Sequence, residues 1–352
     1  MADVTRIAVI GYGLVGRRHA EAIRADGRLS LAGIVEPDPA GRADAMALGA
    51  PVLDDLAGLA GVAPDGCVIS TPTPLHLPLA LDCIARGWPL LIEKPIAVTT
   101  AEARRIVDAA AAAGVPVLVG HHRRHNGRVA AAKSALAGGA IGDIRAVQCT
   151  CWFYKPDAYF EAAPWRKRPG AGPISVNLVH DVDLLRHFCG EVAAVRAVTA
   201  PSARGYDNED LAAAILTFAS GAIGTLSVSD SVVAPWSWEL TSGENPVYPQ
   251  TEESCYLIGG ARGALSIPDM RLWQHAGDGG WWTPMETAPV PCEDGDALAA
   301  QMAHFAQVIR GEVRPLVSAE EGTRSLAIVE AVDRSARTGE VVMLGADGLP
   351  EA

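Results

Sequence analysis

Three consecutive residues, Glu93, Lys94 and Pro95, are the part of this sequence best suited to chemistry. They follow an apolar run and stand about 80 residues after a glycine-rich turn. Ligands of doubly wound sheets bind at the carboxyl ends of the strands, so a lysine there would lie beside a nicotinamide ring. Its ammonium can stabilise negative charge that develops on a substrate oxygen. The run therefore favours a redox enzyme over a protein that only binds a nucleotide.

The glycine-rich turn reads Gly11-Tyr12-Gly13-Leu14-Val15-Gly16, and it lies between an apolar run at residues 6–10 and a helical run at 17–25. Strand, glycine turn and helix form the context that a dinucleotide-binding turn requires. The first glycine permits the turn, the second lets the backbone approach a pyrophosphate, and the third lets helix and strand pack closely. The helix N-terminus offers free N–H groups to the phosphates. We predict a dinucleotide site here, the alternative being an ordinary tight turn.

The next expected strand ends at Glu36, 25 positions after Gly11. A carboxylate at this spacing accepts hydrogen bonds from a ribose 2′-OH and repels a 2′-phosphate. The sequence therefore predicts NAD as the cofactor rather than NADP. Arg42 is near enough to weaken that discrimination, and the alternative for Glu36 is a solvated loop acid.

Composition narrows the class of protein. The chain has 352 residues with 49% hydrophobic content, which suits two domains with a sizeable core. A formal net charge of −12 argues against nucleic acid or an anionic membrane as a partner. We expect no signal peptide, because an apolar strand begins near residue 6, and no uncharged apolar stretch reaches about 18 residues. Seven cysteines without a C-x-x-C pair indicate a reduced, cytoplasmic protein.

Strands and helices alternate in the first third of the chain. We expect strands at residues 6–10, 31–36, 66–70, 89–93 and 116–120, with helices such as 77–86 and 100–113 between them. This alternation predicts an α/β fold with a doubly wound parallel sheet, a Rossmann domain over residues 1–124. The distinctive residues then share one rim, because they follow the carboxyl ends of the strands.

The pattern changes in residues 125–352, for which we predict one α+β domain. Helices are expected at 127–136, 174–188, 297–310 and 318–338. Strand-like runs are expected at 144–153, 193–199, 210–218, 222–229, 236–242, 254–258 and 264–267. Such a succession of strands predicts a large mixed or antiparallel sheet with helices on one face.

With these motifs in order, the chain resembles the Gfo/Idh/MocA family of oxidoreductases. The resemblance rests on Gly11–Gly16 with His19, Ser70-Thr71-Pro72 with His76, Glu93-Lys94-Pro95, Gly120–Arg123, Trp165-Arg166, His180-Asp181-Val182-Asp183-Leu184 and the segment from Ile309 to Gly339. It implies NAD(P)-dependent hydride transfer at a secondary alcohol or carbonyl of a sugar, polyol or cyclitol. It also implies a cis Lys94-Pro95 bond and an open second-domain sheet that joins subunits into a dimer or tetramer.

The resemblance also implies which residues contact the cofactor. Besides the glycine turn and Glu36, we expect contacts from Ser70, Thr71, Pro72, His76, Glu93, Lys94 and Arg123.

Oxidation of an alcohol requires a base for the hydroxyl proton. His180 is our candidate, because the ordinary imidazole pKa of about 6.5 suits proton exchange near neutral pH. Lys94 is the candidate partner that stabilises the developing alkoxide. The alternatives are that His180 is a satisfied helix histidine and that Lys94 contacts only the cofactor.

One position departs from the family pattern. Family dehydrogenases often carry an aspartate four residues before the histidine, and here that residue is Val176. Asn177 and Asp183 lie three residues to either side of His180 and share its face of a helix. We expect both to contact substrate. Asn177 can orient the imidazole but cannot carry charge, so either His180 works without a carboxylate partner or an acid such as Asp183 replaces the missing aspartate.

The segment that runs from Trp152-Phe153-Tyr154-Lys155 through Tyr159 to Trp165-Arg166 interleaves aromatic and hydrogen-bonding side chains. We expect Tyr154, Trp165 and Arg166 to contact substrate. Aromatic faces stack on sugar CH groups, and polar edges bind hydroxyls. The alternative is a loop packed on its own aromatics. His122 is a further expected substrate contact; two arginines follow it, so we expect a basic rim and no metal site.

Two other functions fit the same residues. Some relatives retain NAD and run an oxidation–elimination–reduction cycle as glycosidases or epimerases. A regulatory protein that only senses a dinucleotide is the second alternative.

Overall fold

The computed structural model describes residues 4–277 and 279–351. The chain divides into two compact units. The first unit comprises the described residues up to His125 together with Asp296–Leu326, and the second comprises those of Asn126–Gly295 and from Ala327 onward. The division expected at residue 124 lies one residue before the first crossing between these units, and it assigned Asp296–Leu326 to the second domain.

The first unit is a parallel sheet of six strands in the order β3-β2-β1-β4-β5-β6, which is the doubly wound order. Its strands are β1 (Thr5–Ile10), β2 (Leu29–Val35), β3 (Val52–Leu53), β4 (Gly66–Ile69), β5 (Leu90–Ile92) and β6 (Val117–Val119). Its helices are α1 (Leu14–Ala25), α2 (Pro39–Met46), α3 (Leu59–Val62), α4 (His76–Ala85), α5 (Thr100–Ala113) and α11 (Ala297–Ile309).

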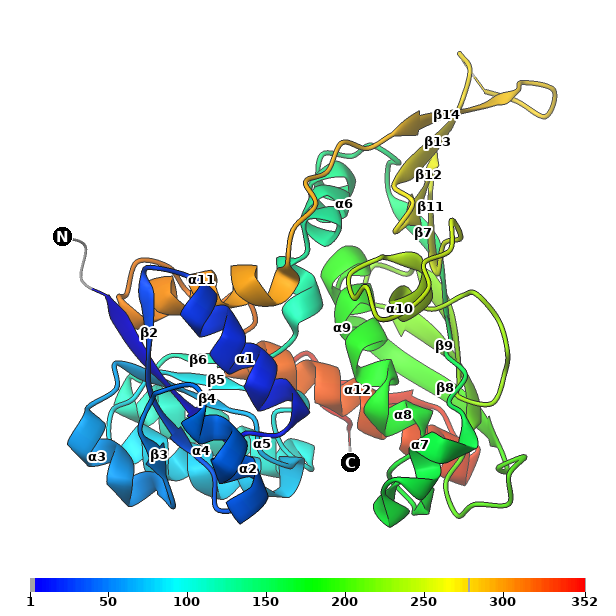
Figure 1. Ribbon diagram of the computed structural model, residues 1–352. Helices are drawn as coiled ribbons and strands as arrows, with labels where there is room; N and C mark the ends of the chain where they lie inside the picture. The colour runs from blue at the N-terminus through cyan, green and yellow to red at the C-terminus, as the bar shows by residue number, and fades with distance from the viewer. Residues whose placement is uncertain (1–3, 278, 352) are drawn as a thin grey trace. The chain divides into compact units, whose positions relative to one another are not determined.

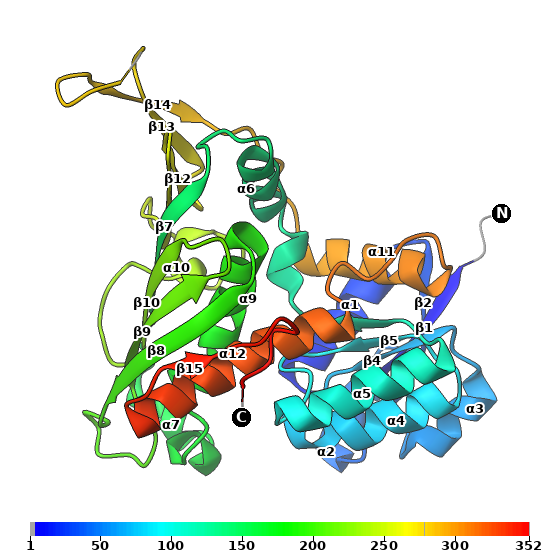
Figure 2. The same cartoon turned by 180° about the vertical axis from the view of Figure 1, so that it is seen from behind.

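Helices cover both faces of this sheet. α1 packs against α11 on one face and α4 packs against α5 on the other, as Figures 1 and 2 show. α11 belongs here because Met302, Phe305 and Val308 are buried in the core of the first unit. Burial on both faces explains why the strands read as continuous apolar runs.

The second unit contains a mixed sheet of nine strands in the order β14-β13-β12-β11-β7-β10-β9-β8-β15. β7 and β10 pair in parallel, and the other neighbours are antiparallel. Its strands are β7 (Ile144–Trp152), β8 (Val192–Ala200), β9 (Leu211–Phe218), β10 (Ile223–Ser229), β11 (Tyr256–Gly260), β12 (Ala264–Ile267), β13 (Arg271–His275), β14 (Met285–Pro289) and β15 (Val342–Met343). The predicted α/β and α+β fold classes are confirmed.

Helices cover one face of the nine-stranded sheet, and the opposite face is open (Figures 1 and 2). The helices are α6 (Gly127–Ala137), α7 (Asp157–Glu161), α8 (Pro173–Val176), α9 (Leu178–Cys189) and α10 (Trp238–Thr241). α12 (Ala319–Thr338) supplies residues to both units.

The helix expected at residues 174–188 is interrupted. α8 ends at Val176 and α9 begins at Leu178, and Asn177 stands between them with φ −102° and ψ −48°. At this point the amide of His180 donates to the carbonyl of Asn177, only three residues back. The break leaves the Asn177 side chain at the start of α9, one turn before His180.

The strand expected at residues 236–242 is wrong. Its residues alternate between apolar and polar, but Trp238–Thr241 form the short helix α10. The hydroxyl of Ser237 caps this helix by accepting a hydrogen bond from the amide of Leu240. Trp238 is buried in the core of the second unit, so its packing decided the local structure.

Within residues 4–277 and 279–351, no helix combines the length and the apolar character that crossing a bilayer requires.

Candidate active site

The glycine turn adopts a conformation that only glycines permit at two of its positions. Gly11 has φ +91°, and its amide donates to the carbonyl of Val35 at 2.8 Å. A Cβ on Gly16 would lie 2.0 Å from the carbonyl oxygen of Gly11. Helix α1 and strand β1 therefore approach as closely as the motif predicts.

Gly13 differs, because a Cβ there would meet no protein atom within 4 Å among the described residues. Gly13 is also the N-cap of α1, and no described side chain caps this helix. The N–H groups of its first turn and the open space beside Gly13 suit the pyrophosphate of a dinucleotide. Leu14 and Val15 stay exposed in that turn, while Tyr12 is buried.

Glu36 directly follows β2, and its side chain lies beside the glycine turn. One oxygen of its carboxylate accepts from the amide of Tyr12 at 2.7 Å, and the other accepts from the amide of Asp38 at 2.9 Å. Gly41 packs directly on it, since a Cβ there would lie 2.9 Å from the Glu36 side chain. The carboxylate is thus fixed beside the glycine turn, which is the place of an acid that accepts hydrogen bonds from the ribose hydroxyls.

The residues after β4 complete the rim of the first unit. Ser70 donates from its hydroxyl to the carbonyl of Gly11 at 2.8 Å. The ring of buried His76 bridges two loops, with Nε2 2.9 Å from the Thr71 carbonyl oxygen and Nδ1 3.0 Å from that of Pro95. Pro72 is exposed at the same rim. These contacts connect the glycine turn to the segment that carries Lys94.

The Lys94-Pro95 bond is cis, as the resemblance implied. Glu93 is buried, and its carboxylate lies 2.8 Å from Nε2 of His19 while accepting from the amide of Lys94 at 3.1 Å. Burial alone would raise the pKa of Glu93, but the bond from His19 and the nearby charges lower it to about 2. Lys94 itself is half-buried at the end of β5.

His122 and Arg123 follow β6 in a short helical turn, His122–His125. His122 is half-buried, while Arg123 is buried. The first unit therefore assembles the glycine turn, Glu36, the β4 rim and the Lys94 segment along the carboxyl ends of its strands.

In the second unit, α9 carries the predicted base. His180 and Asn177 each retain 9% exposure, whereas Asp183 retains 1%. Asp181 is buried too, and its carboxylate accepts a hydrogen bond from the hydroxyl of Tyr256. Asn177 and His180 are thus the more accessible polar residues of this helix face. That Lys94 and His180 act on one carbon stays a prediction, since they belong to different units.

The predicted substrate-binding aromatics form a partly exposed cluster. Tyr154 and Trp165 are 45% and 54% exposed. Arg166 is turned into its own loop: it donates to the carbonyl of Tyr159 at 2.7 Å, and its guanidinium stacks 4.0 Å from the Tyr159 ring. This is partly the self-packed loop considered as the alternative, with Trp165 and Tyr154 left open.

Sequence reasoning missed a buried charged network beside Asn177. Lys155 donates from Nζ to Oδ1 of Asn177 at 2.7 Å and lies 3.6 Å from the carboxylate of Asp230. Arg204 holds the same carboxylate at 2.9 Å. The presence of Lys155 in the aromatic segment was the only signal in the sequence, because Asp230 and Arg204 come from distant loops.

Burying these charges costs hydration free energy, and the ion pairs of Asp230 with Lys155 and Arg204 offset that cost. Burial lowers the pKa of Lys155, against the attraction of Asp230, and burial raises the pKa of Asp230, against Lys155 and Arg204. Mutual attraction and hydrogen bonds offset the loss of hydration for both ions.

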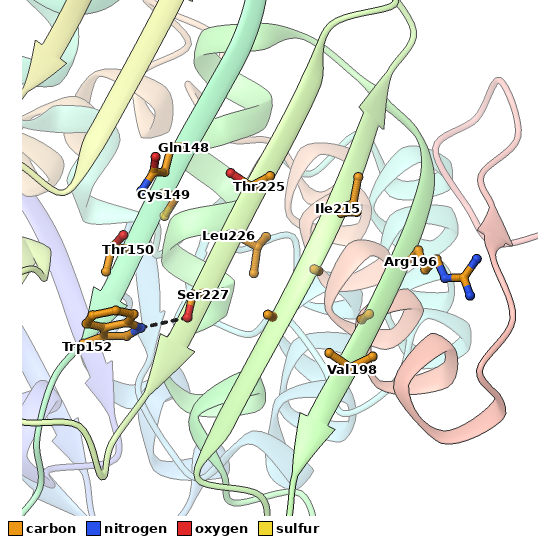
Figure 3. A pocket seen from close by; sticks show the side chains of 13 residues that line it. Gln148, Cys149, Thr150, Trp152, Arg196, Val198, Ile215, Thr225, Leu226 and Ser227 are labelled. Carbon is orange, nitrogen blue, oxygen red and sulfur yellow. Dashed lines mark hydrogen bonds between the residues drawn. The ribbon is translucent and has the colours of Figure 1, made fainter.

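A shallow hollow of about 450 Å³ lies on the open face of the second unit's sheet. Figure 3 shows outward side chains of β7, β8, β9 and β10 around it, with Trp152 donating to the hydroxyl of Ser227 at 2.8 Å. Since α8 and α9 cover the opposite face, this hollow is separate from the residues around His180.

The fold and the glycine turn define a dinucleotide-binding protein of the Rossmann class. Residues 5–121 match the model of the oxidoreductase family with an NAD-binding Rossmann fold, and residues 129–264 match the GFO/IDH/MocA C-terminal domain. The chain belongs to the Gfo/Idh/MocA family of oxidoreductases, as its motifs indicated.

The relatives match most of the chain. It is 30% identical to the D-apiose dehydrogenase of Paraburkholderia graminis over 96% of this chain and 89% of that protein. It is 27% identical to an inositol 2-dehydrogenase of Rhizobium meliloti over 94% and 96% of the two chains. The crystal structure of the WlbA dehydrogenase from Bordetella pertussis, in complex with NADH and UDP-GlcNAcA, has a TM-score of 0.81 at 26% identity, covering 97% and 98%.

Proposed function

We propose that this NAD(P)-dependent oxidoreductase acts on a secondary alcohol of a sugar, polyol or cyclitol, with His180 and Lys94 as its catalytic residues. The observation that carries the proposal is the dinucleotide-binding rim that includes Lys94. The relatives named as sugar and inositol dehydrogenases support the substrate class.

In this reaction His180 takes the hydroxyl proton at an imidazole nitrogen. Lys94 donates a hydrogen bond to the same oxygen and stabilises the negative charge that grows as the proton leaves. The bound cofactor supplies the hydride acceptor. Tyr154 and Trp165 present aromatic faces to the CH groups of the substrate ring, because stacking of this kind needs exposed rings.

NAD is the proposed cofactor rather than NADP. Glu36 is held beside the glycine turn by two backbone amides, and each carboxylate oxygen keeps a second lone pair for a ribose hydroxyl. The same negative charge opposes a 2′-phosphate. Arg42, which was considered because its charge would weaken this discrimination against NADP, is paired with Asp54.

We also propose that the chain forms a homo-oligomer through the open face of its nine-stranded sheet. Four apolar side chains, on outward positions of β8, β9, β10 and β11, are at least 49% exposed there: Val198, Ile215, Ile223 and Leu257. Burial against a second copy would remove this apolar surface from water.

The function is tested with a panel of cyclitols, aldoses and sugar lactones and with Lys94→Ala, His180→Ala and the control His275→Ala, which changes an exposed hairpin histidine. We expect NADH to form, and the first two variants to slow its formation about 100-fold or more while NAD affinity persists. Near wild-type rates in either variant would remove that residue from the mechanism.

The same assay separates the alternatives. An enzyme that retains NAD through a glycosidase or epimerase cycle consumes substrate without net NADH. A regulatory protein binds NAD and turns over nothing on the panel.

A further inference from the structure

The contact between Lys155 and Asn177 has no place in the mechanism above. We propose that Lys155 is a positioning residue: it fixes the side-chain amide of Asn177 so that the amide NH2 group donates to an oxygen of the substrate. This inference deepens the proposed function and rests on it.

The chemistry of the two groups determines which way the amide faces. Nζ of Lys155 lies 2.7 Å from Oδ1 of Asn177. An ammonium has three donors and no acceptor, so only the carbonyl end of the amide can face it. The orientation of this amide is therefore dictated by its partner. The bond is charge-assisted and correspondingly strong.

Lys155 is itself held from several directions. Its amide donates to the carbonyl of Asp230 at 2.9 Å, and its own carbonyl accepts from Arg204 at 2.8 Å. Nζ lies 3.6 Å from the Asp230 carboxylate and 5.2 Å from the centre of the Tyr159 ring. With 7% of its side chain exposed, the lysine cannot swing into water, and it holds the amide as a rigid support.

The other end of the amide is available. Among the described residues, no acceptor receives a hydrogen bond from the Asn177 side-chain NH2 group. Asn177 stands at the break between α8 and α9, one turn before His180, and both retain 9% exposure. The amide nitrogen is not among the buried side-chain atoms that lack a partner, so a ligand oxygen can reach it and accept its hydrogen bond.

The ligand oxygen belongs to a neutral or partly charged group, a hydroxyl or carbonyl. The positive charge of Lys155 is shared with Asp230, and the amide itself is neutral, so the pair does not form a carboxylate-binding site. The lysine also polarises the amide, which makes its NH2 group a better donor as charge develops on the substrate oxygen. Asn177 thus works as a donor, a role different from that of the aspartate that Val176 replaces.

Four single variants and one double variant test this pairing. Each is compared with the control Lys167→Met, which changes a nearby lysine that stacks on Tyr206 instead. On a substrate from the panel, we expect Lys155→Met and Asn177→Ala each to lower kcat/KM about 10- to 100-fold with NAD affinity unchanged. Because the residues act as a unit, the double variant is expected to be no worse than the poorer single variant. Additive losses would overturn the proposal.

Asn177→Asp covers the case in which Lys155→Met does not fold. The new carboxylate pairs with Lys155 and has nearly the same shape, but it lacks the NH2 donor. We expect its kcat/KM to fall as far as that of Asn177→Ala, and a wild-type rate would overturn the proposal. Lys155→Arg, which keeps the donors, is expected to recover part of the rate lost in Lys155→Met.

A measurement without substrate separates this inference from the proposed function. In protein labelled with ¹⁵N-asparagine, the side-chain amide signal of Asn177 is identified by its loss in Asn177→Ala. We expect it to shift or broaden in Lys155→Met and to stay in place in Lys167→Met. An unchanged signal in Lys155→Met overturns the positioning role even if the panel yields a substrate. An inactive panel with a shifted signal overturns the proposed function and leaves the positioning role supported.

Discussion

Glu36 shows how one side chain can set the choice of cofactor. Its two oxygens accept hydrogen bonds from the amides of Tyr12 and Asp38, so the carboxylate cannot turn away from the glycine turn. A fixed negative charge weakens the binding of a ligand that places a phosphate there and strengthens the binding of one that places hydroxyls there. The proposed preference for NAD therefore rests on the position of Glu36 as well as on its residue type.

We expect Glu36→Ala to lower the ratio of kcat/KM with NAD to that with NADP about 10-fold or more, because both the ribose acceptor and the repulsion are lost. Steady-state kinetics with each cofactor at one substrate concentration measures the ratio. Asp82→Ala, which removes an exposed acid on α4, serves as the matched control. If the ratio is the same in Glu36→Ala and wild type, Glu36 does not read the ribose.

At the scale of elements, α1 and the end of β5 are connected by the buried pair of His19 and Glu93. The end of β6 makes room for the pair, since a Cβ on Gly120 would lie 2.9 Å from the Glu93 carboxyl. The carboxylate also holds the amide of Lys94. Glu93 thereby holds the backbone of the segment that carries Lys94.

This pair predicts a pH dependence of stability. The pKa of Glu93 is lowered from 4.5 to about 2, so its stabilising contribution is present above pH 4.5 and is lost as the pH falls toward 2. A shift of this size corresponds to at most about 3 kcal/mol. We expect the urea midpoints of wild type and Glu93→Gln to differ most near neutral pH and to converge between pH 4.5 and 2.

Glu286→Gln, at an exposed acid of β14 in the second unit, is the control for this titration. A difference between wild type and Glu93→Gln that stays constant from neutral to acidic pH would contradict the assignment.

At the scale of the whole molecule, the open sheet face of the second unit is a feature that the candidate active site does not use. β8, β9 and β10 leave Val198, Ile215 and Ile223 between 50% and 65% exposed. A solvated sheet face ordinarily carries polar side chains, so exposed apolar residues there indicate a surface that another chain covers.

We expect wild type to elute as a dimer or tetramer and Ile215→Glu to shift it to a smaller species, because a charge would be buried in the interface. Light scattering after size-exclusion chromatography measures the mass. Val247→Glu, at an exposed apolar residue outside the sheet, is expected to leave it unchanged. A monomeric wild type, or an Ile215→Glu variant of undiminished mass, would contradict the proposed interface.

The sequence alone determined the features that depend on local rules. The glycine turn, the position of Glu36, the Lys94 segment and the alternation of strand and helix follow from backbone geometry and from the period of apolar residues. These properties are carried by neighbouring residues and can be read in order along the chain. The same rules misassigned residues 236–242, where alternation suggested a strand and the capping of α10 by Ser237 prevailed.

Only the tertiary structure decided which distant residues meet. Lys155, Asn177, Arg204 and Asp230 come from four segments, and no spacing in the sequence relates them. The chain also returns to the first unit at Asp296–Leu326, which no local pattern indicates. This return depends on the packing of the apolar face of α11 against α1. Pairing of buried charges and packing of apolar faces are selected by the whole core, so they have no local pattern from which to be inferred.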